Sequence, residues 1–408
     1  MIIVNRPKEL ETIAGVRKWT LIYGRRKTGK TFLVERFVKY DDYFFVNRDR
    51  TILSKISNLR MTYDMLVELL RRDLADGKTV VIDEFQRLGE PFLDLLHSMK
   101  KSGRLILLTS TLFFAKNLLH SRSPLLGLFH EAQIGLMRLD DCLLALNGRI
   151  SSKQQLLESA VMIREPITVD YFEEKEDVRK TFVKILRGLA NTVPALVGEI
   201  FLEEDRGLSA TYEGIIRAVA NGRVVSSEVA SALFASRLIP KDDPSSIQPY
   251  LENLVRIGIL RKLPLYGRKK RFVYKVASPL VRLFFYADEK YGIADRSFED
   301  AEAERIIDAL LPHIIEDELR EYLANKLGLQ ENLLDDGDYE LDGILTRFNK
   351  PALLLEVKWG KVNQAEVDAT EDKLNRIEAA RRILFVQDKK GLKSKALEII
   401  DVGDLSRL

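Results

Sequence analysis

The sequence predicts an α/β protein of several domains: a parallel sheet with a helical lid, then three helices with a hairpin, and then a second, smaller α/β unit. Three observations predict this order: a glycine-rich loop between a β-like run and a helical pattern, three short helical patterns before a basic hairpin, and a charged strand, LLLEVKWGK. A chain of 408 residues can form about two to four domains. We place them at 1–139, 140–205, 206–290 and 296–408.

The composition is that of an ordinary globular protein, with 46% hydrophobic and 31% charged residues and a net charge of +3. Global charge therefore does not indicate a nucleic-acid partner. The opening residues, MIIVNRPKEL, do not form a secretory signal, and no apolar run approaches the length of a bilayer span. We expect a cytoplasmic protein with no membrane partner. The single Cys142 and four histidines exclude a zinc site of Cys/His type, so any metal would bind to carboxylates.

A phosphate-binding loop is predicted at residues 24–31, which read GRRKTGKT. This is the spacing G-x-x-x-x-G-K-[ST], and it follows a β-like run at 19–23 and precedes a helical pattern. The loop and the helix N-terminus bind phosphates through backbone N–H groups, the lysine reaches the terminal phosphates, and the hydroxyl can bind Mg²⁺. The residues expected to bind the nucleotide are Gly24, Arg25, Arg26, Lys27, Thr28, Gly29, Lys30 and Thr31.

The strand predicted at 79–86, TVVIDEFQ, ends in the acids Asp83 and Glu84. A P-loop protein needs an acid at such a strand end to hold Mg²⁺ indirectly, so we expect Asp83 at the metal and Glu84 where it polarises the attacking water. This pair predicts hydrolysis rather than nucleotide binding alone. A third run, RLILLTST at 104–111, ends in hydroxyls that either sense the γ-phosphate or form a Ser/Thr turn after a buried strand.

These three stretches, in this order, resemble the archaeal P-loop ATPase family of the AAA-like and STAND-like ATPases, and VNRPKEL is similar to the N-R-x-x-E-L segment that packs near the adenine in that family. The resemblance implies ATP as the nucleotide, with Lys30, Asp83 and Glu84 in catalysis. Where the family often has S-P-L-x-G-R, this chain reads SPLLGLFH, with Leu128 in place of the arginine. A trans-acting arginine finger is therefore not predicted, and the nearby Arg122 and Arg138 are either substitutes or solvated side chains.

The middle of the chain predicts a helical lid and then a winged helix. Residues 140–205 have a helical pattern with polar interruptions, and from 208 three short helical patterns precede two β-like runs joined by a turn with glycine. A basic hairpin can neutralise several DNA phosphates; a solvated hairpin, or a hinge or protein-contact module, is the alternative. The basic residues of the hairpin are Arg261, Lys262, Arg268, Lys269, Lys270 and Arg271.

In LLLEVKWGK, Glu356 and Lys358 lie on one face, because alternate residues of a strand point the same way. Isolated buried charges are costly, so either this strand end forms a surface ion pair in water or the two charges serve a site. Asp342 lies in the preceding β-like run, YELDGILT. A helix over about 301–327 comes first, and a helix over roughly 363–380 and the strand RRILFVQD follow.

This order of elements, with Asp342, Glu356 and Lys358, resembles the PD-(D/E)XK nuclease core, a restriction-endonuclease-like α/β domain. The resemblance implies that Asp342 and Glu356 hold Mg²⁺ or Mn²⁺ and that Lys358 orients the attacking water or stabilises charge. Glu316 or Glu318, on the first helix, would be a further acid; an exposed helix face is the alternative for both.

Nearly the whole chain thus resembles archaeal ATPases with a winged helix and a C-terminal nuclease-like domain. The resemblance implies an ATP-hydrolysing protein that binds DNA through the winged helix and the C-terminal domain, with metal-dependent DNA cleavage as a further hypothesis. A regulatory ATPase scaffold with an inactive C-terminal binding domain is the main alternative. A small-molecule kinase would leave the winged helix unexplained. A homo-oligomer is compatible with the sequence, which does not determine the oligomeric state.

Overall fold

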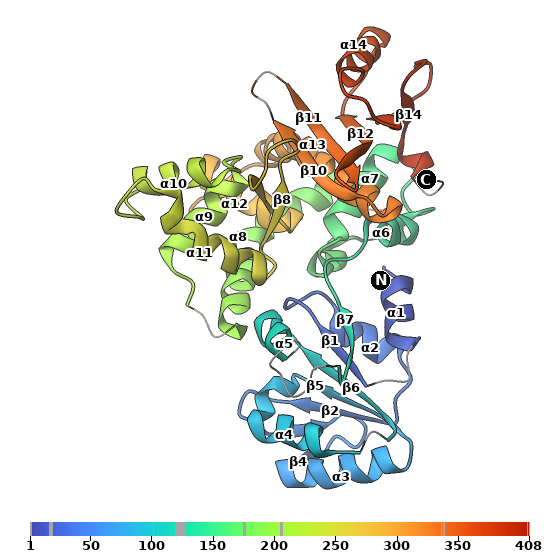
Figure 1. Cartoon of the computed structure of the whole chain (residues 1–408), viewed down its shortest axis with the longest axis vertical. Helices are drawn as coiled ribbons and strands as arrows, with labels where there is room; N and C mark the ends of the chain where they lie inside the picture. Colours follow the sequence, from blue (N-terminus) through green and yellow to red (C-terminus); the bar gives the residue numbers. More distant parts are fainter. Residues whose placement is uncertain are drawn as a thin grey trace.

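The computed structural model describes residues 2–15, 19–100, 102–118, 127–173, 177–204, 207–335, 337, 339–405 and 407. The described residues form two bodies, which Figure 1 shows one above the other, with the N-terminal body in blue to teal below. Two hydrophobic clusters fill the N-terminal body. A third, much larger cluster joins Val4 with residues from 137 to 405.

The N-terminal body is built on a seven-stranded sheet in the order β4-β3-β2-β5-β6-β1-β7. Strands β2, β5, β6, β1 and β7 are parallel, while β3 and β4 pair antiparallel at one edge. The strands are β1 Thr20–Tyr23, β2 Asp42–Val46, β3 Ile52–Ser54, β4 Arg60–Met61, β5 Thr79–Asp83, β6 Arg104–Thr109 and β7 His130–Gln133. The helices are α1 Pro7–Ala14, α2 Lys30–Phe37, α3 Tyr63–Ala75, η1 Phe85–Leu88, α4 Glu90–Ser98 and α5 Leu112–Leu118.

The central strands β1, β5 and β6 read as almost continuous apolar runs because helices cover both faces of a parallel sheet. Because the strands are parallel, their C-terminal ends also lie along the same side of the sheet. The loop after β1, the acids after β5 and the hydroxyls after β6 therefore gather at the same edge. This mixed α/β arrangement is that of a P-loop ATPase fold.

The second body begins with helices, as expected for 140–205, and continues with three short helices and an antiparallel hairpin in the segment expected to be a winged helix. Helix α8 is the longest of this group, and it packs along α12 and α13. The elements are α6 Leu139–Leu146, α7 Lys153–Ile163, η2 Pro166–Tyr171, α8 Val178–Glu203, α9 Ala210–Ala220, α10 Ser226–Ala235, α11 Pro244–Arg256, β8 Leu260–Pro264, β9 Phe272–Val276 and α12 Pro279–Tyr291.

The C-terminal part of the second body is a five-stranded mixed sheet in the order β10-β11-β12-β13-β14. Its first three strands are antiparallel, and β13 and β14 run parallel to β12. The helix expected at 363–380 ends at Leu374. The elements are α13 Asp300–Leu327, β10 Gln330–Asp335, β11 Glu340–Arg347, β12 Lys350–Lys358, α14 Gln364–Leu374, β13 Arg381–Val386, β14 Glu398–Ile400 and η3 Val402–Asp404.

The hairpin β8–β9 is attached to this sheet. The backbone N–H of Tyr266 donates to the Leu333 carbonyl at 2.8 Å, and Leu265 forms an isolated parallel bridge with Leu333. The large cluster includes buried residues of the helices α6 to α8, of α9 to α12 and of the C-terminal sheet. The three segments after residue 137 therefore share one core.

Helix α8 corrects one expectation about the sequence. By length and composition this described helix is apolar enough to cross a membrane, although 44% of its apolar window is buried. A core helix passes the same test, and α8 contributes many buried side chains to the large cluster. Its length is therefore weak evidence for a membrane.

Candidate functional sites

The loop after β1 has the backbone that a phosphate-binding loop needs. Gly24 allows a close approach, since a Cβ added there would lie 2.0 Å from the carbonyl oxygen of Ile134. Gly29 has φ of +86°, a conformation that glycine adopts without the strain of other residues. Arg6 of the opening segment donates to the Thr28 carbonyl at 2.8 Å, so this segment is fixed against the loop.

Lys30 is held inside the loop by neutral partners. Its Nζ donates to the carbonyl oxygens of Gly24 at 2.9 Å and of Arg25 at 3.0 Å. Burial lowers the pKa of Lys30 to about 8, although the negative charges of Glu84 and Asp83 oppose this shift. A cation bound only by carbonyl oxygens can exchange them for a phosphate oxygen at little cost.

Asp83 lies at the end of β5 with two hydroxyl groups on one carboxylate oxygen. Thr31 Oγ1 and the Tyr43 hydroxyl each donate to Asp83 Oδ2 at 2.8 Å. Burial raises the pKa of Asp83, and the hydrogen bonds from Tyr43 and Thr31 oppose the rise. Tyr43, on the neighbouring strand β2, was not predicted, because an apolar strand offers no signal that distinguishes this residue from a core tyrosine.

The residues present fit Mg²⁺ brought by a nucleotide. Thr31 and Asp83 provide a hydroxyl and a carboxylate oxygen next to each other, and Mg²⁺ normally takes few protein ligands beside waters and phosphate oxygens. Within the described part of the chain, no group of three or more His, Cys, Asp or Glu side chains could hold a metal alone. Any Mg²⁺ here would thus depend on phosphate oxygens.

Glu84 follows directly and turns its carboxylate toward the end of β6. Its backbone is left-handed, with φ of +56°, a conformation that a non-glycine residue adopts at a cost and that is common at functional sites. Ser110 Oγ donates to Glu84 Oε2 at 2.8 Å, and Gln86 Nε2 donates to the same oxygen at 2.6 Å. The structure thus joins the predicted water-polarising acid to one of the hydroxyls predicted after the third strand.

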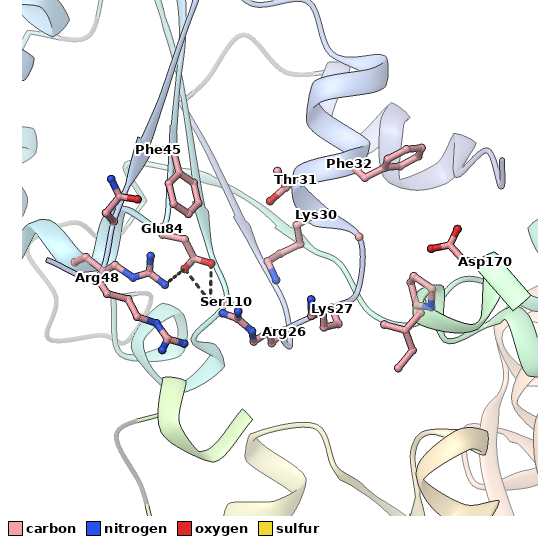
Figure 2. A pocket seen from close by; sticks show the side chains of 15 residues that line it. Arg26, Lys27, Lys30, Thr31, Phe32, Phe45, Arg48, Glu84, Ser110 and Asp170 are labelled. Carbon is pink, nitrogen blue, oxygen red and sulfur yellow. Dashed lines mark hydrogen bonds and ion pairs between the residues drawn. The ribbon is translucent and has the colours of Figure 1, made fainter. Parts of the chain in front are cut away.

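These groups surround a cavity of about 620 Å³. Figure 2 shows Lys30 and Thr31 on one side of it and Glu84 with Ser110 on the other. Pro166 and Ile167 of η2, in the second body, also line it. The cavity therefore lies where the two bodies meet, and both contribute side chains to it.

Acidic residues of the second body hold the arginines of the loop. Arg25 donates to both oxygens of buried Glu165, at 2.8 and 2.7 Å, and Ser278 Oγ donates to Glu165 Oε2 at 2.6 Å. Arg26 pairs with Glu199 at 2.6 Å and with Glu203 at 2.8 Å. Because these partners lie more than a hundred residues away in the chain, no local pattern in the sequence could have revealed them.

The residues weighed as arginine fingers are only partly described. Arg122 lies outside the described residues. Arg138 pairs with Asp140 at 3.1 Å at the start of α6, and Leu128 is partly buried against one hydrophobic cluster of the N-terminal body.

At the C-terminal sheet, Asp342 and Glu356 lie on the neighbouring strands β11 and β12. Asp342 on β11 accepts a hydrogen bond from the backbone N–H of Val357, next to Glu356 on β12, at 2.7 Å. Burial, followed by the negative charges of Glu356 and Glu316, raises the pKa of Asp342 to about 7. Glu318 instead pairs with Arg164, so Glu316 is the α13 acid whose charge acts on Asp342.

Glu356 does not form the surface ion pair that was one alternative. It is 2% exposed, and Lys358 Nζ lies 3.1 Å from its Oε1. Lys373 of α14 donates to both carboxylate oxygens, at 2.7 and 2.8 Å. Lys373 was not predicted, since one lysine on a polar helix carries no distinguishing signal.

Contrary to expectation, not every basic side chain of the hairpin β8–β9 is exposed and free to bind phosphate. Arg261 is held by acids of α13 and β10: it pairs with Glu321 at 3.3 Å and also with Glu331. Its inclusion in an exposed basic cluster was wrong, because these acids come from segments distant in sequence. The tip of the hairpin is exposed at Arg268, Lys269, Lys270 and Arg271.

With parallel sheet, loop and acid pair in place, the N-terminal body has the fold of a P-loop ATPase. Residues 16–135 match the family model of the AAA domain. This part of the chain is therefore similar to AAA domains. No curated protein matches the chain in sequence.

Solved structures with some likeness include the ORC1 and ORC2 proteins of Aeropyrum pernix. The ORC1 protein in complex with DNA is 14% identical, with 71% of this chain and 94% of that chain covered and a TM-score of 0.33. The ORC2 protein with ADPNP and ADP is 14% identical, with coverages of 78% and 95% and a TM-score of 0.40. A signal transduction ATPase with numerous domains from Pyrococcus horikoshii is 15% identical, with coverages of 80% and 48% and a TM-score of 0.30. With TM-scores this low, none of the three informs the function proposed below.

Proposed function

We propose that this protein binds and hydrolyses ATP in the cavity between the loop after β1 and η2. The observation that carries the proposal is that the backbone-held Lys30, Thr31 and Glu84 line one cavity, and that buried Asp83 accepts a hydrogen bond from Thr31. The match of residues 16–135 to the AAA domain supports it.

Each side chain has a distinct task in this reaction. Lys30 would stabilise charge on the terminal phosphates, and Thr31 with Asp83 would hold Mg²⁺, which neutralises phosphate charge when bound. Glu84 accepts hydrogen bonds from Ser110 and Gln86, which fix its carboxylate. It would thus orient a water toward the phosphate and accept its proton.

Nucleotide binding by two matched variants tests the proposal. Lys30→Ala should weaken ATP binding about a hundredfold or more, since it removes a charge-assisted hydrogen bond in a buried site. Lys27→Ala removes an exposed lysine of the same loop and should weaken binding much less. Equal affinities of parent and Lys30→Ala protein in calorimetric titration would contradict the proposed site.

We also propose that residues 206–290 form a winged helix that binds DNA, together with the C-terminal domain. The supporting observation is the basic hairpin tip, where Lys269, Lys270 and Arg271 are exposed and form no ion pair among the described residues. Interactions of this kind position a protein on phosphates without reading sequence. ATP hydrolysis would then be coupled to DNA binding, because both bodies line the nucleotide cavity.

The C-terminal sheet supports a second candidate function, metal-dependent cleavage of DNA by a PD-(D/E)XK-like site. The observation that favours it is that burial, followed by the negative charges of Glu356 and Glu316, raises the pKa of Asp342 to about 7, and carboxylates with such shifts are frequent at functional sites. Asp342 and Glu356 would hold Mg²⁺ or Mn²⁺, and Lys358 would act on the attacking water.

Calorimetric titration of Mn²⁺ into parent and Asp342→Asn protein tests this second function. The parent should show one site that the variant lacks, and plasmid DNA should be cut only by the parent with metal. Identical isotherms would leave the C-terminal domain as a binding module of an ATPase scaffold.

A further inference from the structure

The last residue of α8, Glu203, holds three arginines of the N-terminal body. Its Oε1 lies 2.8 Å from Arg26 Nη1, 3.5 Å from Arg87 Nη2 and 3.6 Å from Arg48 Nη2. The three arginines come from separate elements: the loop after β1, η1, and the segment after β2. All three also line the nucleotide cavity.

Glu203 also reaches the catalytic side of the cavity. Ser110 Oγ lies 3.3 Å from Glu203 Oε2 and 2.8 Å from Glu84 Oε2. A carboxylate from the second body therefore contacts the same hydroxyl as the acid proposed to polarise water. Arginines lie near both carboxylates, since Arg87 Nη2 is also 3.9 Å from Glu84 Oε2, and their charges offset the two negative charges beside the hydroxyl.

The same arginines are suited to phosphate. Guanidinium groups bind carboxylate and phosphate oxygens with the same geometry, so an anion with several oxygens at this end of the cavity would compete with Glu203 for them. The terminal phosphate of a nucleoside triphosphate is such an anion. A diphosphate lacks this group and leaves the arginines to Glu203.

We propose that Glu203 is an intramolecular stand-in for the γ-phosphate, and that Arg26 and Arg87 distinguish triphosphate from diphosphate by exchanging Glu203 for that phosphate. The inference rests on the proposed ATPase function and adds the residues that sense the nucleotide state. It also supplies arginines from within the chain at a site where no trans-acting finger is predicted. Release of the Glu203 carboxylate would remove its ion pairs between the end of α8 and the N-terminal body.

The test is the affinity of the full chain for ADP and for a non-hydrolysable ATP analogue in two variants. Glu203→Gln keeps the size of the side chain but removes the charge that holds the arginines. Glu204→Gln makes the same change of charge one residue later. Glu204 is a suitable control because its Oε1 accepts from the backbone N–H of Leu112 at 2.6 Å.

Glu203→Gln should raise affinity for the triphosphate about tenfold, which is the effect of removing one competing charge-assisted hydrogen bond, and should change affinity for ADP less than about twofold. Arg87→Gln should lower triphosphate affinity alone. Glu204→Gln should leave the ratio of the two affinities at the parent value. An unchanged ratio in Glu203→Gln, or an equal change in Glu204→Gln, would overturn the inference. Failure of the ATPase proposal itself would look different, since Lys30→Ala would then bind both nucleotides as the parent does.

Discussion

Both candidate sites have acids on or next to the strands of a sheet, but the two sites hold their cations differently. At the nucleotide cavity, Lys30 lies on the carbonyl oxygens of Gly24 and Arg25. At the C-terminal sheet, Lys373 and Lys358 both lie on the carboxylate of Glu356. The nucleotide cavity thus has a lysine whose partners are neutral, whereas the C-terminal site has a glutamate whose charge two lysines already neutralise.

This difference predicts how readily each site accepts a ligand. A carbonyl oxygen gives up a lysine to a phosphate without leaving a buried charge unpaired, whereas a metal at Glu356 must compete with two ammonium groups. We infer that the first site is prepared for a polyanion. The second must move a lysine before it can bind a divalent cation.

Other cations of the second body are also paired with acids, as Lys373 and Lys358 are. Arg261 and Lys275 of the hairpin pair with acids of α13 and β10, and buried Arg320 pairs with Asp317 and Glu331. These cations near the C-terminal sheet therefore stabilise the fold. The hairpin tip, with its exposed lysines, is an exception.

The largest effect that we expect is on DNA affinity, and it would distinguish the exposed cations of the hairpin tip from the paired cations of the second body. Replacing Lys269, Lys270 and Arg271 by glutamine should weaken duplex binding by tens of fold at moderate salt and reduce the salt slope by roughly one for each phosphate no longer neutralised. Arg261→Gln is the matched comparison, because that side chain is occupied by Glu331 and Glu321. Weaker binding by Arg261→Gln, with unchanged binding by the triple variant, would place DNA elsewhere.

A smaller effect is expected for metal affinity at the C-terminal sheet. Lys373→Met removes a cation that competes for Glu356, so Mn²⁺ should bind about tenfold more tightly than to the parent. The same variant should not change ATP affinity. Calorimetry of both ligands checks this, and a fall in Mn²⁺ affinity would show that Lys373 assists the site rather than blocks it.

A third effect concerns stability, and its sign follows from the pKa of Asp342. Burial, followed by the charges of Glu356 and Glu316, raises this pKa from 3.8 to about 7. The folded protein therefore binds a proton that the unfolded chain has lost, and this contribution to stability is complete below pH 3.8 and is lost as pH rises through 7. Asp342→Asn should stabilise the protein, with a gain that grows by roughly 2 kcal/mol between pH 5 and pH 8.

Thermal unfolding at the two pH values measures that gain. Glu398→Gln is the control of opposite sign, because the hydrogen bond from Arg381 lowers the pKa of Glu398. That pair is partly exposed, so its removal should destabilise the protein only slightly at pH 8. If Asp342→Asn destabilised the protein at pH 8, this would contradict the claim that the folded protein disfavours the charged form of Asp342.

The parts of the two sites that could be predicted are those encoded within one short segment. The loop at 24–31, the acids after β5 and the Glu356–Lys358 spacing each follow from neighbouring residues. The partners that complete the sites, among them Tyr43, Glu203 and Lys373, come from other elements and have unremarkable local sequences.

The same limit explains the error at Arg261. Its basic neighbours predicted that the Arg261 side chain would be exposed to solvent. Its partner Glu331 is 70 residues away and lies next to it only because the hairpin joins β10. The segments expected as domains after residue 140 share one large hydrophobic cluster, and their bounds stay a prediction. Whether segments share a core depends on side chains that meet only in the folded chain.

The central claim, ATP hydrolysis at the cavity between the two bodies, is tested most directly by the turnover of Glu84→Gln. Glutamine keeps the shape and can still accept from Ser110 and donate elsewhere, but it cannot accept a proton from water. The account predicts that ATP binding stays near the parent value while the hydrolysis rate falls by roughly a hundredfold or more. Hydrolysis at the parent rate by Glu84→Gln, measured as phosphate release with saturating ATP and Mg²⁺, would contradict it.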